Sequence, residues 1–223
     1  MCGRFTITLA ADEVHEQLEL GELPRDWQPR YNVAPSQPVA AVTDAQSRKV
    51  ERLRWGLVPF WAKDVAIGNR LINARSETAA EKPSFRQAFA QRRCLILADG
   101  FFEWQRPKEK KFPSIPYHFH RADRGAFAFA GLWERWRSPE GEELRTCTIL
   151  TTSANGVVAP VHDRMPVILS GADLWAWLNP AKPEELKALL KPYPESLMDS
   201  YPVSRVVNNP SQDVPDCIVP VSR

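Results

Sequence analysis

The sequence predicts an α+β fold, in which a mixed, mostly antiparallel β-sheet, curved or barrel-like, carries peripheral helices. Strand patterns outnumber helix patterns along the chain, and the strands arrive in runs instead of alternating with helices. Twenty prolines among 223 residues are about twice the average share, and they fix many turns and edge strands. The three observations together favour a loop-rich fold built on a sheet.

Strands are predicted wherever β-branched, aromatic and aliphatic residues gather in short runs. These runs cover residues 39–42, 50–55, 94–98, 101–104, 117–121, 126–132, 145–151 and 167–169. The longest apolar stretches, 94–98 and 126–133, have the length of a strand and fall far short of the ~18 residues that cross a bilayer. We therefore expect no transmembrane segment and no membrane partner.

Helix signals are fewer, and four helices are predicted. Asp12 is the expected cap of the first helix, and Ser84 with Gln87 has the spacing of a capping box for the second. Pro183 suits the first turn of a third helix, which is rich in leucine. A short fourth helix is expected over residues 173–178.

Asp99 and Gly100 separate two of the predicted strands and form a dipeptide typical of a tight hairpin turn. We therefore predict a hairpin that joins residues 94–98 to residues 101–104. Glu103 would then lie on a strand among aromatic side chains, where burial raises the pKa of a carboxyl group. This makes Glu103 a candidate acid and base.

The composition is that of an ordinary globular chain, with 43% hydrophobic and 25% charged residues. A chain of this length can bury a full core, and we expect one domain over residues 1–223. The four cysteines are scattered without a Cys-x-x-Cys pair, and no glycine-rich phosphate loop is present, so we expect no metal and no cofactor. The first residues lack the features of a secretory signal, which predicts a cytoplasmic protein.

Net charge is only +2, but the charges are unevenly distributed. Residues 48–111 carry 15 Lys or Arg against 7 Asp or Glu, so the rest of the chain is acidic overall. Arginine outnumbers lysine in this segment, and its planar fork suits phosphate contacts. Aromatic residues interleave with these charges, as they do in proteins that bind single-stranded nucleic acid. A solvated basic face with aromatic residues in the core explains the same pattern. Charge alone therefore does not decide between nucleic-acid binding and an ordinary basic surface.

Cys2 follows the initiator methionine, which is normally removed before a small residue. The cysteine would then carry a free α-amine beside its thiol, with ordinary pKa values of about 8 and 8.5. Such a 1,2-aminothiol reacts with an aldehyde in two steps: the amine forms an imine, and the thiol closes on the imine carbon to give a thiazolidine. Both steps move protons, so the site needs a general acid and base and a group that orients the amine.

Five segments carry a specific combination of motifs in one order along the chain. They read MCGRF at 1–5, YNVAP at 31–35, LINARSET at 71–78, ADGFFEW at 98–104 and PVHDRMP at 160–166. Together they closely resemble the SRAP family, the SOS-response-associated peptidases or abasic site processing proteins. The resemblance runs from Cys2 to about Arg205, essentially the whole chain, and implies an SRAP-like fold.

The resemblance implies a protein that crosslinks itself through Cys2 to the ring-opened aldehyde of an abasic site in single-stranded DNA. The adduct shields the lesion from strand cleavage, and lyase activity and autoproteolytic removal of Met1 would accompany it. Asn73 resembles the amide that positions the cysteine and the sugar, and Glu103 the carboxylate that shuttles protons during crosslinking and reversal. His162 resembles the residue that helps to open the deoxyribose ring.

The same resemblance, with the charge pattern, predicts a set of DNA contacts. The arginines expected on phosphates are Arg4, Arg75, Arg164 and Arg86. The residues expected to form an apolar wall, against which bases stack or a duplex end is blocked, are Pro35, Trp61 and Phe85. Ion pairing with Glu77 or Asp163 is the alternative for the arginines. The expected partner is single-stranded DNA with abasic sites, including those at junctions with duplex, and a monomer suffices.

Three other functions remain open from the sequence. A cysteine-type (auto)peptidase would use Cys2, His162 and Asn73 like a thiol protease and would not need a free α-amine. An N-terminal-nucleophile amidohydrolase is a weaker alternative, because no further glutamine-binding signature accompanies the Cys-Gly start. A non-enzymatic module would bind single strands reversibly and in a salt-dependent way.

Overall fold

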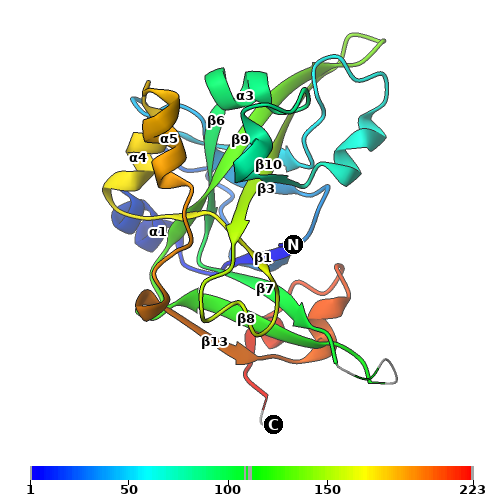
Figure 1. Ribbon diagram of the computed structural model, residues 1–223, viewed down its shortest axis with the longest axis vertical. Coiled ribbons are helices and arrows are strands. Elements are labelled where there is room, and N and C mark those ends of the chain that lie inside the picture. The colour runs from blue at the N-terminus through cyan, green and yellow to red at the C-terminus, as the bar shows by residue number, and fades with distance from the viewer. Residues whose placement is uncertain (1, 108, 110–111, 222–223) are drawn as a thin grey trace.

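The structure is a computed structural model that describes residues 2–107, 109 and 112–221, and its strands form two sheets (Figure 1). Five strands of the larger sheet close into a barrel, because β10 pairs with β4 on one side and with β9 on the other. Around the barrel the order is β10 (Glu143–Ser153), β4 (Val50–Trp55), β3 (Pro38–Val42), β6 (Arg93–Ala98) and β9 (Phe127–Arg137). Short strands extend it: β5 (Asn73–Arg75) and β11 (Arg164–Pro166) on β10, and β12 (Ile168–Leu169) on β9.

The second sheet has five antiparallel strands, and β1 lies near its edge beside the barrel (Figure 1). Its order is β13 (Met198–Pro202), β8 (Ile115–Arg121), β7 (Gly100–Gln105), β1 (Arg4–Ile7) and β2 (Arg30–Val33). The barrel, the antiparallel sheet and the small share of helix confirm the predicted α+β fold. All eight predicted strands coincide with observed ones.

Strands β6, β9 and β10 are buried on both faces over much of their length, and their side chains divide between two cores. On β6, Cys94 and Ile96 point to the same core as Phe129 of β9, whereas Leu95 points to the core under the helices with Ala128 of β9. This alternation is the period of two expected for a strand. Phenylalanines of β9 therefore face one core, whereas its alanines face the other core together with Leu95 and leave room for helices.

Helices cover the outer face of the barrel, with α1, α4 and α5 on one flank and α3 at one end (Figure 1). Their bounds are α1 (Ala11–Leu18), α2 (Ser76–Ala79), α3 (Arg86–Gln91), α4 (Ala172–Leu178) and α5 (Pro183–Leu189). Shorter 3-10 turns are η1 (Val65–Arg70), η2 (Glu195–Leu197), η3 (Arg205–Asn208) and η4 (Pro215–Ile218). Within the described part of the chain, no helix has the length and apolarity needed to cross a membrane.

Two helix caps differ from the prediction. Helix α1 begins after Ala10 instead of Asp12, and the carboxylate of Glu13 accepts the Ala10 N–H at 2.9 Å. Helix α3 follows Phe85 and has no side-chain cap, so the capping box expected at Ser84 is wrong. Both caps lie within two residues of the predicted start, where tertiary packing outweighs the local preference. The helices with Pro183 and over residues 173–178 are confirmed as α5 and α4.

The hairpin predicted at Asp99 is also wrong. Strand β6 pairs with β3 and β9 in the barrel, whereas β7 pairs with β1 and β8 in the other sheet. Asp99 therefore marks the point where the chain passes from one sheet to the other. Its carboxylate accepts hydrogen bonds from the hydroxyl groups of Thr6 (2.5 Å) and Thr8 (2.7 Å). The carboxylate thus ties the passage between sheets to the end of β1.

Candidate active site

Cys2 lies two residues before the start of β1 and is completely buried, in the same apolar cluster as Phe5 and Phe129. Its Sγ lies 3.6 Å from the carbonyl oxygen of Arg4 and is the donor of a weak hydrogen bond. Burial raises the pKa of the Cys2 thiol well above its usual range, and the charge of Glu103 raises it further. The sulfur is therefore held as a neutral thiol and not as a thiolate.

Asn73 comes from the barrel and reaches the backbone of the cysteine. It opens β5, which runs parallel to β10 with Asn73 opposite Ile149. Its Nδ2 donates a hydrogen bond of 2.7 Å to the carbonyl oxygen of Cys2. Its Oδ1 is buried and has no hydrogen-bond partner among the residues that the structure describes. The amide thus holds the backbone of Cys2, and its oxygen is left as a buried acceptor that a bound molecule could use.

Glu103 lies on β7, the neighbour of β1. The antiparallel register places Arg4 opposite Phe102, so Glu103 comes next to the residues that precede β1. The side chain is 3% exposed, and burial raises the pKa of its carboxyl group, while the nearby charge of His162 opposes this shift. The prediction that aromatic neighbours raise this pKa agrees in direction with the structure. A carboxyl group of this kind holds its proton to a higher pH than an exposed glutamate does, and it can pass the proton to a stronger base.

His162 lies in the loop between β10 and β11. Its Nδ1 accepts a hydrogen bond from the backbone N–H of Arg164 at 3.0 Å, which suits a neutral ring with the proton on Nε2. The same Nδ1 is 3.0 Å from Oδ1 of Asp163, which suits a protonated ring. The loop therefore offers a partner for each protonation state of the imidazole.

The four side chains converge from distant parts of the chain. Cys2 comes from the segment before β1, Asn73 from β5, Glu103 from β7 and His162 from the loop before β11. A hydrogen bond joins the first pair, and electrostatic interactions link Glu103 with both Cys2 and His162. The set lies where the barrel meets the five-stranded sheet. It combines a nucleophile, an amide that orients the backbone, and two groups that can carry a proton.

The four predicted arginines fall into two groups. Arg75 and Arg86 are exposed. Arg164 donates from both terminal nitrogens to the carboxylate of Glu77, at 2.6 and 2.9 Å, so the alternative of an ion pair holds for this residue. Arg4 is half-buried and takes part in a network of neutral acceptors, described below. Of the four predicted arginines, Arg75 and Arg86 therefore present an exposed positive charge, whereas the charge of Arg164 is neutralised by Glu77.

The three residues of the expected apolar wall differ in exposure. Trp61 is 49% exposed, and its neighbour Phe60 is 56% exposed, so two aromatic rings face solvent in one loop. Pro35 is half-buried between β2 and β3. Phe85 is 5% exposed and packs in the core under the helices. The buried ring of Phe85 therefore has no free face on which a base could stack. Its position directly before helix α3 places it in the core under the helices.

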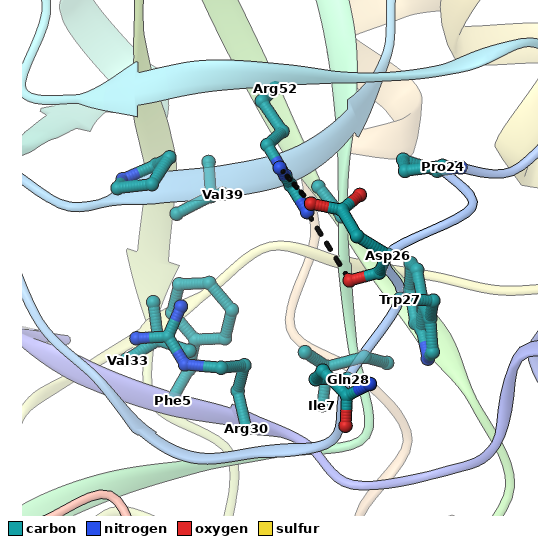
Figure 2. A pocket seen from close by; sticks show the side chains of 12 residues that line it. Phe5, Ile7, Pro24, Asp26, Trp27, Gln28, Arg30, Val33, Val39 and Arg52 are labelled. Carbon is teal, nitrogen blue, oxygen red and sulfur yellow. Dashed lines mark hydrogen bonds and ion pairs between the residues drawn. The ribbon is translucent and has the colours of Figure 1, made fainter.

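A cavity of about 250 Å³ is lined by residues of β1, β2, β3 and β4 and of the loop before β2 (Figure 2). Phe5 and Val39 line its apolar part, and Trp27 closes one side. The carboxylate of Asp26 and the guanidinium of Arg52 face each other at its rim, 2.8 Å apart. None of the four converging side chains lines this cavity, so it is separate from the candidate site. Among the described residues, no cluster of His, Cys, Asp and Glu could hold a metal ion.

Three residues near the site had no predicted role in the sequence analysis, although two of them bind the segment that contains the third. Asn32 is fully buried, Trp104 is half-buried, and Asn208 is exposed on η3. The side chains of Asn32 and Trp104 both bind the segment that contains Asn208. Asn32 and Trp104 belong to the quoted motifs YNVAP and ADGFFEW, and this was the available signal. The contacts themselves join residues about 100 to 180 positions apart.

Comparisons with known proteins agree over nearly the whole chain. The sequence profile of the family "SOS response associated peptidase (SRAP)" matches residues 1–210. The abasic site processing protein YoqW of Bacillus subtilis (strain 168) is 46% identical over 225 residues, with 98% of this chain and 99% of YoqW covered. The abasic site processing protein HMCES of Xenopus tropicalis is 31% identical over 263 residues, with coverage of 99% and 78%. An X-ray structure of a protein from Bacteroides thetaiotaomicron superposes with a TM-score of 0.87 at 28% identity, covering 99% of this chain and all of the other.

Proposed function

The chain belongs to the SOS response associated peptidase (SRAP) family, and on this premise we propose that it processes abasic sites in single-stranded DNA by forming a thiazolidine crosslink through Cys2. Two relatives that cover nearly the whole chain carry the name abasic site processing protein. The observation that carries the proposal is the buried thiol of Cys2, placed beside Glu103 and tethered through its own carbonyl by Asn73.

The reaction requires removal of Met1, which frees the α-amine of Cys2. The amine attacks C1′ of the ring-opened deoxyribose, and the resulting carbinolamine loses water to form an imine. The thiol then adds to the same carbon, and its proton passes to the imine nitrogen. One aldehyde and one aminothiol thus give one thiazolidine and one water. A neutral thiol suits this order, because its proton is needed in the last step.

Glu103 carries protons in this scheme. With its raised pKa the carboxyl group donates a proton to the carbinolamine hydroxyl that leaves as water, and it accepts one when the ring closes. His162 opens the sugar by handling the proton of the ring oxygen. Reversal uses the same groups in the opposite order, and elimination from the imine would account for lyase activity.

The DNA strand is proposed to follow the exposed arginines and aromatic residues. Arg75 and Arg86 offer charge to phosphates, and the ring of Trp61 offers a stacking face. Pro35 adds a rigid wall at the turn after β2, where a duplex end at a junction would stop. In this scheme the protein acts as a monomer in the cytoplasm, and it associates with the nucleoid when it binds DNA.

A cysteine peptidase ranks behind this proposal. Thiol proteases depend on a thiolate stabilised by an imidazolium, which lowers the pKa of the cysteine. Here burial raises the pKa of the Cys2 thiol, and the hydrogen bond of its Sγ goes to a backbone carbonyl. Autoproteolytic removal of Met1 is compatible with the site, because the protein would cleave only its own chain and only once.

The experiment uses intact-mass spectrometry to confirm loss of Met1, followed by a denaturing gel. The protein is mixed with a single strand that contains one abasic site and, in parallel, with a strand that carries a tetrahydrofuran analogue, which has no aldehyde. We expect a shifted band with the abasic strand alone, and a mass equal to the sum of protein and DNA less one water. A processed protein that gives no shifted band would overturn the proposal.

A further inference from the structure

A segment near the C-terminus, residues 203–218, lies against the outer strand of the five-stranded sheet, and we call it the strap (red and orange in Figure 1). Its first contact is the carboxylate of Asp213, which accepts the backbone N–H groups of Tyr31 at 2.6 Å and Asn32 at 2.9 Å and pairs with Arg30. The strap thus covers an edge strand that would otherwise expose unpaired backbone groups.

The second contact is the side chain of Asn32. Its Nδ2 lies within hydrogen-bond distance of three strap carbonyls, those of Val207 (3.2 Å), Asn209 (3.0 Å) and Gln212 (2.7 Å). Its Oδ1 accepts from a terminal nitrogen of Arg4 at 2.8 Å. Since the carbonyls only accept and the guanidinium only donates, the orientation of this amide is fixed on both sides.

Arg4 is held in a cradle of neutral acceptors. Besides Asn32, its guanidinium donates to the carbonyls of Val207 (2.6 Å) and Asn208 (3.3 Å). None of these three acceptors carries a charge, in contrast to the carboxylate of Glu77 that receives Arg164. Burial lowers the pKa of the Arg4 guanidinium, because its charge is partly removed from water. The cradle therefore fixes the position of a cation and leaves its charge to attract an anion.

Asn208 sits beside this cation with a fixed side chain. Its Oδ1 accepts the indole N–H of Trp104 at 2.7 Å, and an indole nitrogen only donates. The Nδ2 group of Asn208 must therefore face away from the indole. The residue is exposed, and its own carbonyl receives Arg4. One residue thus presents an oriented amide donor beside a guanidinium.

The cation and the amide lie at the end of the sheet that carries the nucleophile. Arg4 is two residues from Cys2, and Trp104 follows Glu103 on the neighbouring strand. The resemblance already placed Arg4 on a phosphate, and we propose that the side-chain amide of Asn208 completes this phosphate subsite for the DNA strand next to the lesion, with Asn32 as the residue that positions both. This inference rests on the proposed function and adds Asn208 and Asn32, which the sequence did not assign.

Reversible binding of an undamaged oligonucleotide tests the subsite without any crosslink. Asn208→Asp keeps the acceptor for Trp104 and replaces the donor by a negative charge, so we expect affinity for a fluorescent single strand to fall about tenfold at low salt. Asn209→Asp is the matched control. It adds the same charge one residue away and keeps the acceptor for the N–H and hydroxyl of Ser211. We expect its affinity to fall less than threefold, roughly the effect of an exposed charge.

The salt dependence identifies the anion that is bound. Arg4→Gln should reduce the slope of log affinity against log salt by about 0.7, the value for one phosphate contact on a single strand. Equal losses in Asn208→Asp and Asn209→Asp, or no loss in either, would overturn the subsite. If Asn208→Asp fails to show the wild-type circular dichroism spectrum, Asn208→Ala replaces it, with a loss of about threefold expected for one neutral donor.

The two proposals fail in different ways. A wild-type protein that binds strands but forms no adduct would remove the crosslinking function and leave the subsite standing. A wild-type protein that forms the adduct while Asn208→Asp binds as tightly as Asn209→Asp would remove only the subsite.

Discussion

The side-chain amide of Asn73 donates a 2.7 Å hydrogen bond to the backbone carbonyl of Cys2, and so joins the barrel to the segment that precedes the first strand of the other sheet. The bond acts on the backbone of the cysteine and leaves the sulfur untouched. It therefore fixes the place from which both the amine and the thiol would reach an aldehyde. The first prediction concerns this bond.

Asn73→Ala should slow crosslinking under single-turnover conditions by about tenfold, the effect of one lost hydrogen bond of roughly 1.4 kcal/mol. Asn69→Ala is the control, because the side chain of this exposed residue likewise makes one hydrogen bond, as the acceptor from the Ser36 hydroxyl at 3.0 Å. Quenched gels over time give both rates. Equal rates for the two variants would show that Asn73 does not position the cysteine.

The second prediction separates the amine from the thiol. Cys2→Ala keeps a free α-amine, so it should give no heat-stable adduct but should still be trapped on the abasic strand by borohydride as a reduced imine. One glycine added before Cys2 keeps the thiol and displaces the amine, and should leave little of either product. A stable adduct in Cys2→Ala would exclude thiazolidine formation.

The third prediction uses the raised pKa of Glu103. The carboxyl group holds its proton to a higher pH than usual, so the crosslinking rate of the wild type should fall on the alkaline side as that proton is lost. Glu103→Gln should react more slowly and lack this fall, because an amide does not titrate. Glu81→Gln, at an exposed carboxylate, should keep the wild-type profile. Superimposable profiles for Glu103→Gln and the wild type would remove Glu103 from the chemistry.

The fourth prediction concerns His118, a buried residue of β8 that the mechanism does not use. Its Nε2 is 3.2 Å from the hydroxyl of Thr6, its Nδ1 is 3.1 Å from the hydroxyl of Tyr201, and the rings of His118 and His120 lie 5.6 Å apart. Burial lowers the pKa of His118 to about 3, with His120 and Arg124 adding to the shift. In the unfolded chain this histidine binds a proton near pH 6.5, whereas in the folded chain it stays neutral until about pH 3. The free energy of unfolding therefore decreases as pH falls below 6.5.

Urea unfolding at pH 6.5 and pH 5 measures this loss. We expect the wild type to lose up to about 2 kcal/mol, at roughly 1.4 kcal/mol per pH unit for one histidine. His118→Gln should be less stable at pH 6.5 but should lose less on acidification. The exposed His15 serves as the control, and His15→Gln should follow the wild type. A His118→Gln protein with the full pH dependence would assign the effect to other groups.

Local patterns predicted the strands well and the connections less well. The apolar run 94–98 forms most of β6, and its continuous apolar composition matches the burial of this strand on both faces. The dipeptide at Asp99 suggested a hairpin, yet its carboxylate serves the end of β1, more than 90 residues earlier in the chain. The short strands β1 and β2 were not predicted, because polar residues such as Arg4 and Asn32 interrupt their apolar pattern.

The sequence by itself determined the fold class, the strand-forming runs and the four chemical candidates of the motifs, because residue type and order along the chain carry this information. Only the tertiary structure decided which arginines keep an uncompensated charge, since Arg164 meets Glu77 and Arg4 meets neutral carbonyls. It also decided that Phe85 faces the core. Burial and charge pairing depend on neighbours distant in sequence, and folding alone brings those neighbours together.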